Sequence, residues 1–160
     1  MNEWVGQKGF TLIESIMTLV ILGILSVTFL PKFFALSSYQ QKVLFDDTLA
    51  AICYAQKLAV ATGCNIQVSI ASNTFMLKRP SAIDRSQCAS TTAAYFTRDV
   101  TNPGTGETQF TGSQSGISLT STTFYFTALG SVSSGQTIFI GGTRKITVIK
   151  ETGFVYDSTS

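Results

Sequence analysis

The longest apolar run of the chain lies near its amino terminus. Residues 10–30 read FTLIESIMTLVILGILSVTFL and contain one charged residue, Glu14. As an α-helix, a run of this length would rise about 31 Å, which matches the hydrocarbon core of a bilayer. Its apolar residues cover all sides of the helix rather than one stripe, and this distribution favours lipid over the surface of a soluble domain. We therefore predict a transmembrane helix over residues 10–30.

Two other interpretations of this run fit less well. A helix buried in a protein core would have to be enclosed completely by the rest of the chain. A secretory signal peptide would have a shorter apolar region and a small-residue cleavage site, and the following residues 31–34 (PKFF) do not resemble one. We therefore expect the run to remain on the mature protein.

Helical spacing continues beyond the run, from residue 32 to about residue 62. Apolar side chains recur on one side of this segment, at Leu36, Val43, Ala50 and Leu58, with Leu44 and Ile52 beside them. Gly63 is a typical helix stop. We predict that the first helix continues here as an amphipathic helix packed on a folded domain.

The rest of the chain carries β-strand signals. Alternation and turn residues predict strands over 65–71, 74–79, 116–119, 123–129, 137–141, 144–150 and 153–156. Residues 80–116 are rich in Ser, Thr and Gly and are predicted as loop, with a short strand near 94–97. The Gly141–Gly142 pair indicates a turn. The predicted fold class is α+β, a long amino-terminal helix with a membrane half and an amphipathic half, packed on a carboxyl-terminal antiparallel sheet.

The amino-acid composition excludes several kinds of functional site. The chain is 44% hydrophobic and 12% charged, has a net charge of +2 and contains no histidine. The apolar content argues against disorder, and the missing histidine excludes His-based triads and most zinc sites. Gly104 and Gly106 lack the Lys-Ser/Thr that a phosphate loop requires. We expect no enzymatic activity, no cofactor, no metal and no small-molecule substrate.

Glu14 is the anomaly of the apolar run. A lone carboxylate in a membrane-spanning segment costs about 2.5 kcal/mol or more. Either the carboxyl group is protonated there, or a cation from another chain neutralises it.

Residues 8–14 (KGFTLIE), followed by the apolar run, resemble the processing site of type IV prepilins and pseudopilins. The resemblance implies that the prepilin peptidase removes a leader, residues 1–9, by cleaving after Gly9, and that Phe10 is then N-methylated. It also implies that Glu14 meets the terminal amine of a neighbouring subunit during assembly. An ammonium and a carboxylate within about 4 Å attract strongly in a low dielectric, which would account for the lone carboxylate. Pro31 corresponds to a helix-kinking proline of many pilins.

A second resemblance covers the carboxyl-terminal half. Residues 126–130 (FTALG), 137–140, 144–149 and 153–155 look like the domain of FimT/GspH-type minor pilins and minor pseudopilins. The cysteines and the Ser/Thr-rich middle resemble a minor pilin of the mannose-sensitive haemagglutinin (MSHA) pilus.

These resemblances imply a pilin-like organisation: leader 1–9, transmembrane and assembly helix 10–30, and a periplasmic α+β domain over 31–160. The protein would cross the inner membrane once, with its carboxyl-terminal domain in the periplasm, and then enter a filament on the cell surface. Its partners would be major and minor pilin subunits, the prepilin peptidase and the assembly platform. The implied role is filament assembly or initiation in an MSHA-type pilus, with adhesion as an addition. The alternatives are a minor pseudopilin of a type II secretion system and a DNA-binding pilin.

Three cysteines leave two pairings open. If the helix runs nearly to Gly63, Cys53 and Cys64 lie about 16 Å apart, too far to bridge. A Cys64–Cys88 disulfide is the favoured pairing, and Cys53–Cys88 is the alternative.

Arg144, Lys145 and Lys150 form a basic cluster in one predicted strand. Alternation places Arg144 and Lys150 on one side and Lys145 on the other. A solvated strand edge is the plain interpretation. Phosphate contact with DNA is the functional one.

Overall fold

The computed structural model describes residues 11–81 and 85–159, without the side chains of residues 28–36. The chain divides into two compact units, Met1–Tyr39 and Gln40–Ser160. A single helix, α1 (Leu12–Thr62), runs through the first unit and into the second. The two predicted helical segments are therefore one continuous element.

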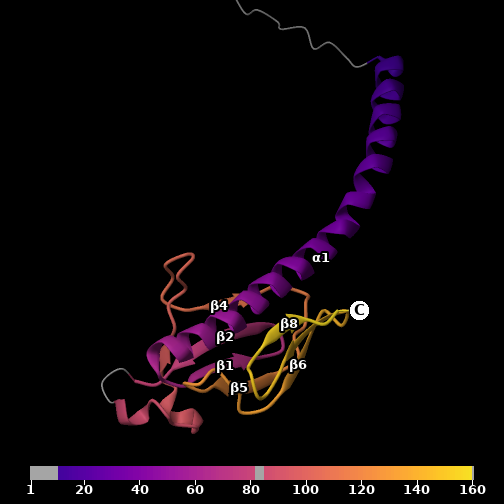
Figure 1. Ribbon diagram of the computed structural model, residues 1–160. Helices are drawn as coiled ribbons and strands as arrows, with labels where there is room; N and C mark the ends of the chain where they lie inside the picture. Colours follow the sequence, from indigo (N-terminus) through magenta and orange to yellow (C-terminus); the bar gives the residue numbers. More distant parts are fainter. Residues whose placement is uncertain (1–10, 82–84, 160) are drawn as a thin grey trace, which may run out of the picture. The chain divides into compact units, whose positions relative to one another are not determined.

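Strands make up most of the second unit. They are β1 (Ile66–Ile70), β2 (Thr74–Arg79), β3 (Arg98–Asp99), β4 (Thr111–Ser113), β5 (Thr122–Phe126), β6 (Gln136–Ile140), β7 (Arg144–Val148) and β8 (Val155–Asp157), with 3-10 helices η1 (Arg85–Gln87) and η2 (Ala93–Tyr95). The α+β class is confirmed. The part of α1 within this unit lies over the strands (Figure 1).

The predicted packing of the helix on antiparallel β-structure is confirmed, and the strands are divided between two sheets. The first sheet has the order β3-β2-β1-β5 with β4 also paired to β2, and the second has the order β6-β7-β8. All pairings are antiparallel, and β1 is central, with Gln67 opposite Lys78 on β2 and Tyr125 on β5. Two isolated bridges join loop residues to the sheet edges, Leu119 to Ile140 of β6 and Val132 to Phe126 of β5.

Several strand predictions also need correction. Residues 94–97 hold η2 in place of a strand, whereas β3 and β4 form inside the region predicted as loop. Residues 116–119 contribute one isolated bridge and no strand. Strand β5 stops at Phe126 because Gly130 N–H donates to the carbonyl of Thr127 at 2.8 Å and closes a turn.

Helix α1 ends where the sequence predicted. Gly63 adopts φ 67°, a conformation that suits glycine, and its N–H donates to the carbonyl of Ala59 at 3.0 Å. This bond satisfies one of the carbonyls that a helix end leaves without an intrahelical partner.

The face of α1 that enters the core is shifted from the predicted one toward Leu44 and Ile52, which were predicted beside it and are buried, and the side chain of Leu36 lies outside the described set. Val43 and Leu58 are half-buried and Ala50 is exposed. The buried residues of the helix recur at spacings of three and four and are Leu44, Phe45, Thr48, Ala51, Ile52, Ala55 and Ala59. Alanines carry little weight in a hydropathy pattern, yet their small side chains allow the sheets to approach the helix closely. The core-facing side of α1 therefore includes the alanines at positions 51, 55 and 59, which we call the alanine seam.

The core combines this helix face with both sheets. Its strand residues are aliphatic and aromatic: Ile66, Val68, Ile70, Phe75, Leu77, Phe124, Phe126, Ile138, Ile140, Ile146 and Val148, each at most 3% exposed. One face of each sheet is thus apolar and covered. The positions between these residues are half-buried or exposed, except Gln67 on the central strand, which is buried.

Two glutamines of α1 hold the helix to turns of the strand region. Gln41 Nε2 donates to the carbonyl of Gly141 at 2.9 Å. Gln56 Nε2 donates to the carbonyls of Gly130 and Thr152 at 3.2 and 2.9 Å. Neutral hydrogen bonds of this kind contribute about 1 kcal/mol each, and their main effect is to fix the helix in one position along the sheets.

Candidate assembly site

Glu14 lies in the first turn of α1. The backbone N–H of Glu14 donates to Oγ1 of Thr11 at 3.3 Å, and Ser15 N–H donates to the Thr11 carbonyl at 3.2 Å. Thr11 thus caps the helix, and a glutamate three residues after the cap is the sequence signature of a capping box. The sequence interpretation missed this local role, although the Thr-x-x-Glu spacing signals it. The carboxylate also lies near the positive end of the helix dipole.

The described side chains from Thr11 to Val27 are all exposed. The large apolar ones among them have exposed fractions of 45–79%. Hydroxyl groups in this stretch return to their own helix, since Ser26 Oγ donates to the Leu22 carbonyl at 2.7 Å and Thr18 Oγ1 to the Ser15 carbonyl at 2.9 Å. An apolar surface of this size, with its hydroxyls satisfied internally, is typical of a surface that another apolar phase or helix covers.

No helix in the described part of the chain combines the length and apolar character needed to cross a membrane. The transmembrane prediction for residues 10–30 is therefore not confirmed. Gly9 and Phe10 lie outside the described residues, so the cleavage and methylation site stays a prediction. Position 31 lies within α1, but the side chain of Pro31 is outside the described set, and the predicted kink stays a prediction as well.

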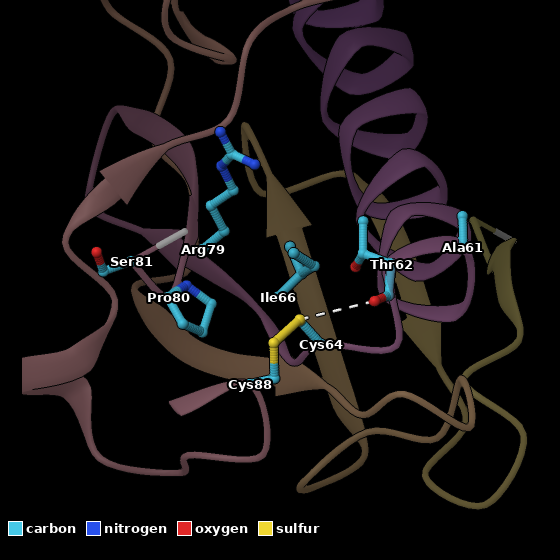
Figure 2. Close-up of a pocket in the computed structure, with 8 residues that line it drawn as sticks. All are labelled: Ala61, Thr62, Cys64, Ile66, Arg79, Pro80, Ser81 and Cys88. Carbon is cyan, nitrogen blue, oxygen red and sulfur yellow. Dashed lines mark hydrogen bonds between the residues drawn. A yellow bond between two sulfur atoms is a disulfide. The ribbon is translucent and has the colours of Figure 1, made fainter. Parts of the chain in front are cut away.

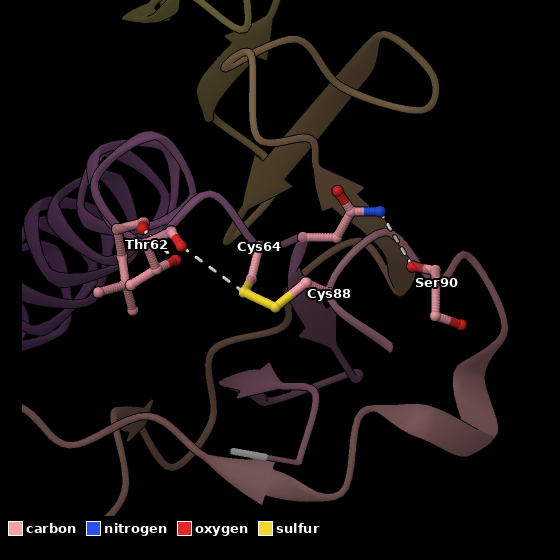
Figure 3. Close-up of a disulfide and its surroundings, with 6 residues drawn as sticks. Thr62, Cys64, Cys88 and Ser90 are labelled. Atoms are coloured by element: carbon pink, nitrogen blue, oxygen red, sulfur yellow. Dashed lines mark hydrogen bonds between the residues drawn. A yellow bond between two sulfur atoms is a disulfide. The ribbon is translucent and has the colours of Figure 1, made fainter. Parts of the chain in front are cut away.

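The structure contains a disulfide between Cys64 and Cys88, with Cα atoms 4.2 Å apart (Figure 3). This is the favoured of the two pairings, and Cys53 is free. Next to the disulfide, Asn65 N–H donates to the Cys88 carbonyl at 2.7 Å and Asn65 Nδ2 to the Ser90 carbonyl at 2.9 Å. The end of α1 and the start of β1 are thereby tied to the segment around η1.

Replacing both Cys64 and Cys88 by serine is expected to lower the free energy of unfolding by about 3 kcal/mol, because the disulfide closes a loop of 24 residues in the unfolded chain. Thermal or urea unfolding of the oxidised protein and the double variant measures the difference. Cys53→Ser serves as the control, and it is expected to respond to a reductant as the parent protein does. An unchanged midpoint in the double variant would contradict the prediction.

The free thiol of Cys53 is half-buried on α1, and burial raises the pKa of Cys53, with Lys57 partly opposing this shift. A raised pKa leaves less thiolate at a given pH. We expect iodoacetamide to alkylate Cys53 more slowly at pH 8 in the folded protein than in the urea-unfolded protein, with the difference narrowing as the pH rises. Mass-spectrometric alkylation rates test this. Equal rates in the two states at pH 8 would contradict it.

The basic cluster predicted from the sequence is not gathered on one face. Arg144 lies on the core side of β7, with its guanidinium 5.4 Å from the ring centre of Phe45, a cation–π distance. Lys145 alternates to the other side and stands opposite Phe139. Strand β7 ends at Val148, so the alternation that grouped Lys150 with Arg144 does not reach Lys150. A DNA-binding role for these residues remains a prediction.

The described residues were also considered as metal ligands. The described residues contain no cluster of three or more His, Cys, Asp or Glu side chains that could hold a metal ion.

Comparison with known proteins gives two matches. Residues 4–30 match a family model described as the prokaryotic N-terminal methylation motif. The structure is similar to that of the minor pseudopilin EpsH from the Type 2 Secretion System of Vibrio cholerae, with a TM-score of 0.53 and 12% sequence identity over 75% of this chain and 97% of that chain. The chain has the pseudopilin fold. No curated protein sequence matches it.

Together, the motif and the fold support the type IV pilin and pseudopilin family. They do not separate an MSHA-type pilus from a type II secretion system, and they give no support to the particular resemblance to the MSHA minor pilin MshC.

Proposed function

We propose that this protein is a minor subunit of a type IV pilus of the MSHA type, processed after Gly9 and built into the filament through α1. The observation that carries the proposal is the methylation motif over residues 4–30. The exposed apolar surface of α1 from Thr11 to Val27 supports it, because neighbouring helices in a filament would cover such a surface. The subunit role is structural rather than catalytic, as it is for pilins and pseudopilins in general.

In this proposal residues 10–30 anchor the subunit in the inner membrane before assembly. The carboxylate of Glu14 then meets the amine of a neighbour's Phe10, and the two charges offset each other's cost of leaving water. Residues 31–160 form the domain on the periplasmic side and later on the filament surface.

The state of the amino terminus tests the proposal. Intact-mass analysis of the protein from its native membranes should show a chain that begins at N-methylated Phe10. Trp4, the sole tryptophan, leaves with the leader, so the mature protein should show tyrosine emission alone. Gly9→Val is the control, because it should block cleavage and retain tryptophan emission. A mature chain that keeps residues 1–9 would overturn the proposal.

A second candidate, a minor pseudopilin of a type II secretion system, is favoured by the fold similarity to EpsH. A complemented deletion strain separates the two candidates. Loss of surface filaments with normal enzyme secretion would support the pilus subunit. Normal filaments with failed secretion would support the pseudopilin.

A further inference from the structure

Arg79, the last residue of β2, has a buried side-chain nitrogen without a partner. Alternation along β2 puts Arg79 on the same side as Phe75 and Leu77, both of which are buried beneath α1. The Nε atom of Arg79 is buried and has no hydrogen-bond partner among the described residues. An unsatisfied buried donor costs about 1–3 kcal/mol, and more when the group is charged. The Nε–H group of Arg79 is therefore a donor that the described residues leave without an acceptor.

The Arg79 side chain lines two cavities beside the carboxyl-terminal turns of α1. One, of about 310 Å³, is lined by Ala61, Thr62, Cys64, Ile66, Pro80, Ser81 and Cys88, and Figure 2 shows Arg79 extending past Ile66, away from the disulfide. The other, of about 150 Å³, is lined by Tyr54, Leu58, Val100 and Thr101. No carboxylate appears among the described residues that line either cavity.

A second arginine adds to the positive charge at this position. Arg98 of β3 is paired directly with Arg79, so both side chains lie on the same side of the sheet. Like charges at opposed positions destabilise a sheet unless an anion lies between them. The neighbouring pair, Lys78 and Asp99, lies on the opposite side, where Asp99 accepts a hydrogen bond from Gln109 Nε2 at 2.8 Å. That carboxylate therefore does not serve the two arginines.

We propose that Arg79 and Arg98 form an oxyanion-binding site, and that its ligand is a carboxylate side chain of a neighbouring protein subunit. A guanidinium presents its N–H groups as a planar fork that matches a carboxylate. The walls contributed by Leu58, Ile66 and Val100 are apolar and suit the methylene stem of an acidic side chain. That the carboxylate comes from a subunit rests on the proposed function, whereas the oxyanion site itself rests on the two arginines.

The test uses the full-length protein in detergent and follows thermal unfolding by circular dichroism. N-acetylglutamate amide, which presents one side-chain carboxylate, is titrated at constant ionic strength, with N-acetylglutamine amide as the uncharged probe. At ten times its dissociation constant, the carboxylate probe should raise the unfolding midpoint by about 4 °C in a saturable manner. The amide probe should have no effect. This assay does not involve Phe10 or Glu14, so its failure and a failure of the proposed function are distinguishable.

Three variants identify the arginines as the site. Arg79→Gln should abolish the response, and Arg98→Gln, at an exposed position, should weaken the binding about tenfold without unfolding the protein. Lys78→Gln is the matched control, because it removes the same charge one residue away on the other side of the sheet and should leave the response intact.

Each contrary result would overturn the proposal. Equal shifts of the unfolding midpoint with the two probes would show that the site does not recognise the negative charge. An undiminished response in Arg98→Gln would show that Arg98 does not contribute to binding. Saturation by inorganic phosphate at concentrations tenfold lower than the carboxylate probe requires would assign the site to free phosphate.

Discussion

Replacement of Glu14 by alanine is expected to stop incorporation of the protein into filaments while synthesis and cleavage after Gly9 continue. Without the carboxylate, the amine of a neighbour's Phe10 would enter a low-dielectric interface unpaired, at a cost of about 3–5 kcal/mol. That cost corresponds to a loss of at least roughly a hundredfold in incorporation. Immunoblots of sheared filaments and of membranes, compared for the variant and the parent protein, measure the ratio. Normal incorporation would exclude this role of Glu14.

The helix cap provides the control for this experiment. Glu14 also lies in the first turn of α1, where its N–H donates to Thr11 Oγ1. Thr11→Val removes that bond, costs about 1 kcal/mol of local helix stability and keeps the carboxylate. Incorporation of Thr11→Val should therefore stay close to that of the parent. If both variants failed equally, helix initiation rather than charge pairing would explain the loss.

Gly153→Ala is expected to destabilise the folded domain by about 3 kcal/mol. Gly153 has φ +63°, which an alanine adopts at a cost of about 1–2 kcal/mol. Its new methyl group would overlap the carbonyl oxygen of Gly130, and Gln56 Nε2 lies 2.9 Å from the same position. Moving the Gly130 carbonyl would also break its bond from Gln56. Urea unfolding monitored by circular dichroism gives the free-energy difference.

Gly142→Ala separates backbone strain from overlap. Gly142 has φ +78°, and nothing lies within 4 Å of the position its Cβ would take. This variant should therefore lose only about 1–2 kcal/mol. If Gly153→Ala proved no more harmful than Gly142→Ala, the close approach between the two turns would contribute nothing to stability.

Local sequence signals were sufficient to predict those helices and strands whose formation depends on residues close to them in the chain. The end of α1 at Gly63 and the strands β1 and β2 followed from a stop residue, turn residues and alternation. The division into two sheets did not follow, because β5 pairs with β1 across a long stretch of chain, and β6 pairs with β7 across a short turn. The sequence pattern gives no measure of which distant strand will be chosen.

The candidate sites show the same limit. A role for Glu14 could be inferred because a single charged residue in an apolar run can be recognised from the sequence alone. Arg79 was not recognised as a candidate site, although alternation along residues 74–79 places it on the side of Phe75 and Leu77. The unsatisfied Nε atom of Arg79 and the pairing of Arg79 with Arg98 depend on the tertiary structure and cannot be read from the sequence. The core face of α1 was misplaced for a related reason, since alanines at 51, 55 and 59 are defined by what packs against them.

The two glutamine attachments of α1 have a mechanical consequence. Gln41 and Gln56 are separated by about 22 Å of helix, and Gln41 is bonded to one turn of the strand region whereas Gln56 is bonded to two others. A force applied along the helix axis would load both attachments in shear and at the same time, together with the tightly packed alanine seam between them. Bonds loaded in parallel must rupture together, whereas bonds loaded in series open one by one. The domain is thus built to stay attached when its helix is pulled.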